Sequence, residues 1–271
     1  MFDTSTPVSA TRSVGHLLRD WRLQRRRSQM ELALEVGVST RHLSFLETGR
    51  AAPSRQMLLR LAEQLDLSLR GRNALLIAGG FAPMFRERAL DDPQLQAARA
   101  AVDTILAGHE PHPALAVDRH WNLLAANRPV MHLLAGVDAA LLEPPVNVLR
   151  LSLHPQGLAP RIVNLAEWRA HLLHRVAQQI DSSGDRELDA LLTELRAYPA
   201  AIGEPAPTPR DAAAIAVPFR LRSPVGTLSF FSTTTVFGTP VDITLDELAL
   251  ECFFPADEAT AAAMRTIAID A

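Results

Sequence analysis

Four polar side chains follow one another closely within residues 40–44. They are Thr40, Arg41, His42 and Ser44. Arginine can donate two hydrogen bonds to a guanine, and serine and threonine can bond to several base edges in the major groove of DNA. Three further polar residues stand nearby: Gln29, Arg50 and Arg55. Donors of these types commonly bind phosphate oxygens, so the group favours recognition of double-stranded DNA.

The spacing of small and capping residues around this group predicts a helix-turn-helix over residues 28–50. Ala33 lies where two crossing helices need a small side chain, and Gly37 lies in the tight turn, where φ must be positive. Ser28 and Glu31 have the spacing of a capping box, which marks the start of the first helix. The second helix follows the turn, and in this motif its N-terminal turns enter the major groove. An ordinary helical hairpin is the competing interpretation.

The segments around the motif predict a compact all-α domain of five helices over residues 10–80. An amphipathic segment precedes the motif, and helices capped by Ser54 and Ser68 follow it. Phe45 has two interpretations: contact with a thymine methyl group, or cover for the edge of the core. Residues 1–80 contain 12 arginines and seven acidic residues, whereas the remainder carries a net charge of about −8. The basic part of the chain is thus the part that contains the motif.

The composition limits the chemistry open to the rest of the chain. With 271 residues and 48% hydrophobic content, the chain can form packed cores in two domains. All 27 basic residues are arginines, which excludes lysine Schiff bases and lysine general bases. The single cysteine, Cys252, excludes an internal disulfide and a cysteine-based zinc site, and it fits a buried apolar strand. We predict no catalysis and no cofactor, because residues 100–271 contain no recognisable nucleophile–base pair.

The sequence also contains no apolar segment long enough to cross a bilayer. The N-terminal residues lack the basic and then apolar pattern of a signal peptide. We therefore expect a cytoplasmic protein with no membrane partner.

A second domain is expected over residues 111–271, after a linker and connecting helix over residues 81–110. Its predicted elements are two short strands, two longer helices and three further strands: 114–117, 121–126, 165–180, 187–198, 214–221, 226–237 and 245–254. This order predicts an α+β fold with one antiparallel sheet and helices packed on it, which is the order of a PAS-like sensor domain. An apolar pocket for a small molecule can form between such layers.

The candidates for the lining of such a pocket are large apolar residues of these elements: Trp121, Leu123, Trp168, Leu172, Phe219, Phe230 and Phe231. Core packing is the competing role for each of them. His154 and Arg175 could bind an acidic head group, with surface ion pairs as the alternative for the arginine. His171 and His174 have a spacing that can chelate a metal, but no third ligand follows at a recognisable interval, so no metal site is predicted.

Several segments together resemble the MmyB-like transcription regulators. They are the segment from Gly71 to Pro83 and the segments WNLLAAN, LHPQGLAPRIVN and CFFPADEAT. SQxELA, the GVS turn and LETGR, in turn, resemble the phage-repressor-like, or xenobiotic-response-element, helix-turn-helix proteins. The resemblance implies that Gln29, Arg50 and Arg55 touch phosphate, and that Thr40, Arg41 and Ser44 read bases. It also implies a PAS-like domain that binds a hydrophobic effector such as a fatty acid.

These observations predict a sequence-specific transcription regulator whose second domain senses a small hydrophobic molecule. Repressor-type helix-turn-helix domains bind palindromic half-sites as two-fold dimers, so we expect a homodimer. A ligand-independent repressor whose second domain serves only dimerisation is the alternative. An enzyme tethered to DNA by the helix-turn-helix is a further alternative, and it would need catalytic groups that the sequence does not show.

Overall fold

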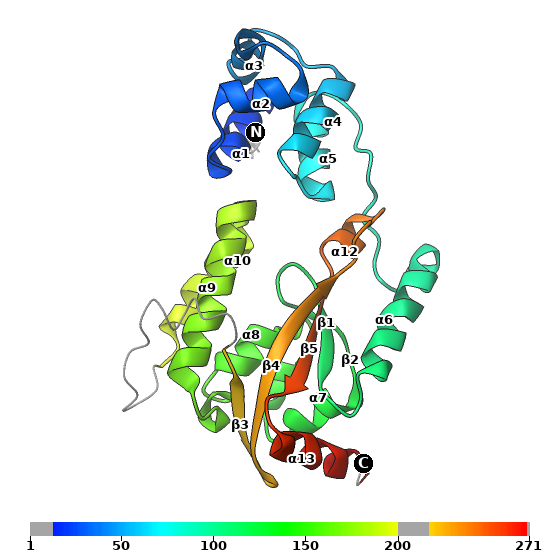
Figure 1. Ribbon diagram of the computed structural model, residues 1–271, viewed down its shortest axis with the longest axis vertical. Helices are drawn as coiled ribbons and strands as arrows, with labels where there is room; N and C mark the ends of the chain where they lie inside the picture. The colour runs from blue at the N-terminus through cyan, green and yellow to red at the C-terminus, as the bar shows by residue number, and fades with distance from the viewer. Residues whose placement is uncertain (1–12, 200–216, 270–271) are drawn as a thin grey trace, which may run out of the picture. The chain divides into compact units, whose positions relative to one another are not determined.

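The computed structural model describes residues 13–199 and 217–269 (Figure 1). Contacts divide the chain into two compact units, the first formed by residues up to 87 together with 240–246, and the second by 88–239 together with the residues from 247 onward. The division at residues 87 and 88 falls inside the linker that the sequence predicts. Each unit is described separately below.

The first unit is helical, as the sequence predicted. Its five main helices are α1 (Val14–Gln24), α2 (Gln29–Val36), α3 (Thr40–Glu47), α4 (Arg55–Gln64) and α5 (Leu69–Ala78). Each is preceded by a serine whose hydroxyl accepts a hydrogen bond from the backbone N–H three residues on: Ser13, Ser28, Ser39, Ser54 and Ser68. Such caps satisfy backbone donors that a helix leaves open at its start, so the ends of these helices are set by local sequence.

The turn between α2 and α3 has the geometry that the motif requires. Gly37 ends α2 with φ +74°, a conformation that favours glycine. Ala33, Leu43 and Leu46 are at most 1% exposed and join α2 and α3 to the core of the unit. A sixth, single-turn helix, α12 (Ile243–Asp246), belongs to the same unit.

The second unit is built on a five-stranded antiparallel sheet. The strands are β1 (Ala114–Val117), β2 (Leu123–Ala126), β3 (Phe219–Ser223), β4 (Gly226–Val236) and β5 (Ala249–Pro255), in the order β2-β1-β5-β4-β3. The last predicted strand begins at Ala249 rather than at residue 245, because the preceding residues form α12. Part of the third predicted strand, residues 214–216, lies outside the described residues.

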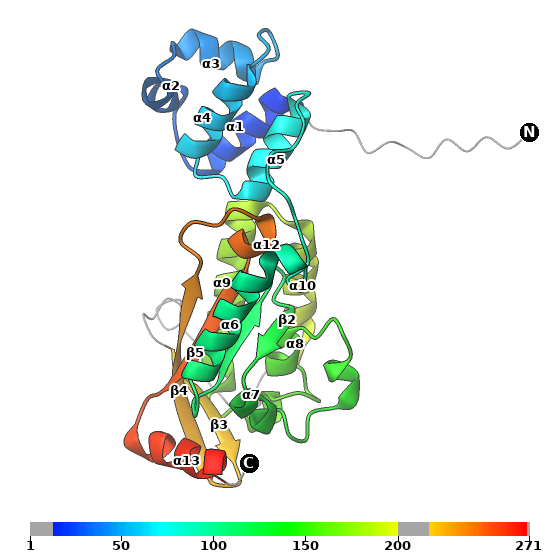
Figure 2. The ribbon, with the colours of Figure 1, turned by 90° about the vertical axis from the view of Figure 1, so that its right-hand side faces the viewer.

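Helices cover both faces of this sheet. They are α6 (Gln96–Gly108), α7 (Arg128–Leu133), α8 (Val148–Leu153), α9 (Leu165–Ser183), α10 (Arg186–Ala197) and α13 (Glu258–Ile269). In Figure 1 α6 lies on one side of the sheet and α8 and α9 lie on the other, and in Figure 2 α6 lies in front of the strands. The main core forms on the α9 side, where Trp168 and Leu172 pack with Leu221 and Phe230. The sequence predicted two strands, then helices, then three strands. In the structure these elements form the expected α+β fold, an antiparallel sheet with helices packed on it.

Candidate functional site

The recognition candidates lie on α3. Ser39 accepts a hydrogen bond from the His42 N–H at 3.1 Å, and the buried Leu43 and Leu46 hold the opposite face of the helix on the core. Thr40 and Arg41 are exposed, and His42 and Ser44 are half-buried. The first turns of α3 thus present hydrogen-bonding groups to solvent on a helix whose position is set by core packing.

Two arginines, Arg41 on α3 and Arg50 just after it, lie close to the ring of Phe45. The guanidinium carbon of Arg41 lies 5.3 Å from the centroid of the Phe45 ring, and that of Arg50 lies 5.9 Å from it. Phe45 itself is half-buried. Cation–π attraction therefore gathers the two charges at one aromatic ring, although the sequence assigned them to bases and to phosphate respectively.

A buried polar triad supports α3 from behind. Arg22 on α1 donates from Nε and Nη2 to the two carboxylate oxygens of Glu47, at 2.6 and 2.9 Å, and Gln29 donates to the same carboxylate at 2.8 Å. The side chains of Arg22 and Glu47 are 8% and 2% exposed. Burial by itself would raise the pKa of Glu47, but the hydrogen bonds from Arg22 and Gln29 outweigh it and hold the pKa below its usual range.

The triad changes the expected environment of Gln29. The sequence assigned its amide to a phosphate, whereas one amide N–H is directed to Glu47 in the described structure. Arg55, the first residue of α4, is exposed. The sequence analysis assigned no role to Arg22 or Glu47. The one signal for a buried ion pair was the charged residue Glu47 directly after the buried Leu46.

An apolar cavity lies between the sheet and the helices of the second unit. It encloses about 780 Å³ when its opening to solvent is included. Six residues that the sequence singled out line it: Trp121, Leu123, Trp168, Leu172, Arg175 and Phe219. Much of the remaining lining is aliphatic and comes from α7, α8 and the segments beside them.

Three other candidates do not line the cavity. Phe230 is fully buried in the core, where its ring lies beside the rings of Phe219 and Phe253. Phe231 is 38% exposed and stacks on Phe254, because successive residues of a strand point to opposite faces of the sheet. His154 follows α8, where its Nδ1 accepts a hydrogen bond from a backbone N–H and its ring meets Tyr198 edge-on.

One charged pair borders the cavity. Arg175 on α9 donates to both carboxylate oxygens of Glu251 on β5, at 2.7 and 3.3 Å, and to the Thr234 hydroxyl at 3.0 Å. The guanidinium lies 4.8 Å from the centroid of the Trp121 ring. The sequence analysis did not identify Glu251 as part of the site. The available signal was the presence of one carboxylate in an otherwise apolar strand.

The comparisons with known proteins identify both domains. A family model described as the MmyB-like transcription regulator ligand binding domain matches residues 98–267, which is more than half of the chain. The chain belongs to this family. A helix-turn-helix family model matches residues 18–71. No curated protein matches the chain. The family that the sequence suggested is therefore confirmed, and the chain is a DNA-binding transcription regulator with a ligand-binding domain.

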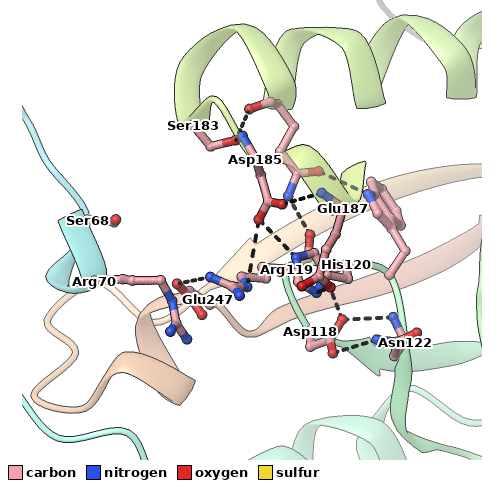
Figure 3. A network of polar contacts seen from close by, with 12 residues as sticks. Ser68, Arg70, Asp118, Arg119, His120, Asn122, Ser183, Asp185, Glu187 and Glu247 are labelled. Carbon is pink, nitrogen blue, oxygen red and sulfur yellow. Dashed lines mark hydrogen bonds and ion pairs between the residues drawn. The ribbon is translucent and has the colours of Figure 1, made fainter. Parts of the chain in front are cut away.

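A polar network in this regulator holds the turn that carries Trp121 (Figure 3). Asp118 accepts hydrogen bonds from the N–H groups of His120 and Asn122, both at 2.8 Å. The His120 ring lies 2.9 Å from the carboxylate of Asp185, between α9 and α10. Burial would raise the pKa of Asp185, but the hydrogen bonds from His120 and from the Glu187 N–H, together with the nearby charge of Arg119, outweigh it and lower the pKa.

The network fixes Trp121 in an unusual backbone conformation. Trp121 has φ +67°, which is costly for a bulky residue and persists only where the surroundings enforce it. Its indole N–H donates to Gln179 at 3.0 Å, and Gln179 in turn donates to the Arg119 carbonyl at 2.7 Å. The regulator thus holds one aromatic wall of the cavity by hydrogen bonds to α9.

The histidines on α9 form no recognisable metal site. Across residues 13–199 and 217–269, no three side chains of the metal-binding types are grouped around a common point. The His171 ring stacks on Trp168, and burial lowers the pKa of His171. A search of the same ranges for a helix able to span a bilayer finds none.

Proposed function

We propose that this regulator binds a specific operator as a homodimer, and that its cavity binds a small hydrophobic effector which changes the affinity for DNA. The observation that carries the proposal is the apolar cavity of the second unit. Its lining is predominantly apolar, with Arg175 and Glu251 as its charged groups, which is the pattern typical of small-molecule sites. The protein would therefore couple the presence of a hydrophobic compound to transcription.

In this proposal, α3 enters the major groove. The base-reading residues are Thr40, Arg41, His42 and Ser44, and the phosphate-binding residues are Gln29, Arg50 and Arg55. The exposure of Thr40 and Arg41 on the first turn of a capped helix supports the base-reading role. The second amide N–H of Gln29 and the backbone N–H groups at the start of α2 suit a phosphate oxygen. Two copies would read half-sites about 34 Å apart, the usual spacing for repressor-type dimers.

The second domain acts in this proposal as a PAS-like sensor without catalysis. Its ligand contacts would be those predicted residues that line the cavity, Trp121 and Trp168 among them. Fatty acids are the first class of effector to test, because the family resemblance implies them. Uncharged compounds of the same chain length belong in the same panel.

A pair of tryptophan substitutions tests the sensor role. Leu123→Trp places a large ring where Leu123 lines the cavity, whereas the neighbouring Leu124 lies in the same strand but does not line it. A ligand at a hundred times its dissociation constant should stabilise the wild type by about 2.7 kcal/mol. We expect L123W to lose this stabilisation and L124W to keep it, as measured by thermal unfolding with each compound. If no compound of the panel stabilises the wild type, the sensor proposal fails and the ligand-independent repressor replaces it.

A further inference from the structure

We infer that Phe45 is a further specificity-determining residue, which contacts the C5 methyl group of a thymine in the base pair next to the guanine that Arg41 reads. The inference rests on the proposed function, because it adds a base contact to the same helix, α3. It also names a feature of the operator: a thymine–adenine pair beside a guanine–cytosine pair in each half-site.

Phe45 lies on the face of α3 that presents Arg41 to solvent. Residues four positions apart in a helix lie on the same face, and Arg41 and Phe45 have this spacing. Leu43 and Leu46, which are fully buried, mark the opposite face. A large apolar ring is therefore placed on the side of the helix that is proposed to enter the major groove.

Core packing does not account for this ring. In the described part of the first unit, the half-buried apolar side chains that pack against the core include Phe81 but not Phe45. Two guanidinium groups lie beside the ring instead, and the Phe45 carbonyl accepts a hydrogen bond from the Arg50 N–H at 2.8 Å. Cover for the edge of the core, one of the two interpretations of Phe45, is thus not favoured.

The chemistry of the two side chains divides the bases between them. A phenylalanine side chain has no hydrogen-bond donor or acceptor, and the major-groove feature that suits an apolar side chain is the thymine methyl group. Arg41 has no hydrogen-bond or ion-pair partner within residues 13–199 and 217–269. Its N–H groups are available for the two acceptors of a guanine.

The distance between the two side chains places their contacts in neighbouring base pairs. Successive base pairs are about 3.4 Å apart along the duplex axis. The guanidinium carbon of Arg41 lies 5.3 Å from the centroid of the Phe45 ring, which is less than two such steps. One base pair cannot supply both a guanine and a thymine, because guanine pairs with cytosine. The two bases must therefore belong to adjacent pairs.

Removing single methyl groups from the operator tests the inference in the full-length protein. In an operator obtained by unbiased selection, each thymine is replaced in turn by 2′-deoxyuridine, which lacks only the C5 methyl group. Competition binding then measures each dissociation constant. We expect one position in each half-site where wild type binds about fourfold more weakly, corresponding to about 0.8 kcal/mol for one buried methyl group. Phe45→Ala should bind the thymine and uracil forms equally at that position.

Methylated cytosine provides a second readout, because 5-methylcytosine carries its methyl group at the same C5 position as thymine. Replacing the identified thymine–adenine pair by cytosine–guanine should weaken binding by wild type. Methylation of that cytosine should then tighten binding about fourfold, for the same reason. F45A should not respond to this methylation.

Two variants and one measurement on wild type serve as controls. Phe81→Ala shortens a phenylalanine that packs against the core of the same unit, and Thr40→Ser removes the methyl group of another base-reading candidate. Both should retain the fourfold effect of uracil. In wild type, 5-iodo-2′-deoxyuridine at the identified position should form a light-induced cross-link to Phe45, located by mass spectrometry. The cross-link also decides the question if F45A fails to fold.

The outcomes are distinct. The inference is overturned, with operator binding left in place, if no thymine shows the effect, if F45A retains it, or if the cross-link forms at another residue. Altered dimerisation of F45A in sedimentation experiments, together with an unchanged uracil effect, would assign the ring to contact with a second copy and also overturns it. A wild type that does not prefer any sequence over random DNA removes the operator proposal itself and this inference with it.

Discussion

Individual side chains of the first unit divide between those that face solvent and those that hold α3 in place. Arg41 and Arg50 share the ring of Phe45, whereas Glu47, two residues beyond that ring, turns inward to Arg22 and Gln29. The residues proposed to contact DNA and those that support the helix therefore follow one another closely in the sequence. Substitutions in this segment should separate into effects on binding and effects on folding.

Arg41→Ala should reduce discrimination between operator and random DNA. Arg41 is exposed on the first turn of α3, and an arginine that reads a base pair contributes about 1–3 kcal/mol of specificity. Competition binding with an operator obtained by unbiased selection measures the effect. Arg99→Ala, on α6 of the second unit, is the control. Equal weakening on operator and random DNA would count against base reading.

Arg50→Ala should weaken binding to every sequence alike. A phosphate contact contributes through counterion release, so its loss should lower the salt dependence of the association constant by about one ion. The measurement is a titration of DNA binding over a range of salt concentrations. An unchanged slope would contradict the phosphate role.

Glu47→Gln should destabilise the helix-turn-helix by about 3 kcal/mol at pH 7, because removing one member of a buried ion pair leaves the other charge unmatched. The pKa of Glu47 is lower in the folded state than in the unfolded chain. Its stabilisation is therefore present in full above the ordinary carboxylate pKa and is lost as the pH falls through the folded-state value.

The pH dependence provides the check on this interpretation. Chemical unfolding of wild type and E47Q from pH 7 downward should show a difference that shrinks as the pH falls below about 4. A difference that stays constant over this range would show that packing, rather than the charge of Glu47, accounts for the effect.

At the level of helices, serine caps fix where the helices of the first unit begin, and a close contact between α1 and α3 fixes how these two helices pack. The backbone of α1 passes directly against the end of α3 at Gly15. A Cβ atom at Gly15 would lie 2.4 Å from the Glu47 carbonyl oxygen and 2.6 Å from that of Leu46. Both neighbours are backbone atoms, so the contact can be relieved only by moving one helix away from the other.

Gly15→Ala should therefore destabilise the protein by about 1–3 kcal/mol, the usual cost of overpacking. Gly108→Ala is the matched control, because nothing lies within 4 Å of a Cβ at this helical glycine. Thermal unfolding followed by circular dichroism compares the two variants. A loss of stability at Gly108 as large as that at Gly15 would contradict the steric explanation.

For the molecule as a whole, the proposed coupling has a thermodynamic consequence. The chain passes between the two contact units at residues 87–88, 239–240 and 246–247. An effector that changes DNA affinity must bind the free and DNA-bound forms of the regulator differently. Typical coupling free energies of about 1–3 kcal/mol correspond to changes of about 5- to 150-fold.

We expect the effector to change the dissociation constant for operator DNA by such a factor, and operator DNA to change the dissociation constant for the effector by the same factor. Binding titrations of each partner with and without the other measure both values. A factor of one in both directions would mean that the cavity binds a ligand without regulatory effect.

The parts of this protein that the sequence predicted correctly depend on neighbours in the chain. Serine caps, the glycine turn and the spacing of Ala33 and Leu43 act within a few residues, so they specify the helix-turn-helix from the residue order alone. The order of strands and helices in the second unit could be predicted for the same reason, because each element has its own pattern of apolar residues.

Features that join distant residues required the folded chain. Arg175 and Glu251 are 76 positions apart, and Arg22 and Glu47 are 25 apart, so neither pair has a local signal. The different positions of Phe230 and Phe231 depend on which strand face meets α9, which is set by the pairing of β3, β4 and β5. Local sequence specifies where an element begins and what it contains, whereas strand register and helix packing, which are set by long-range burial, specify which side chains meet.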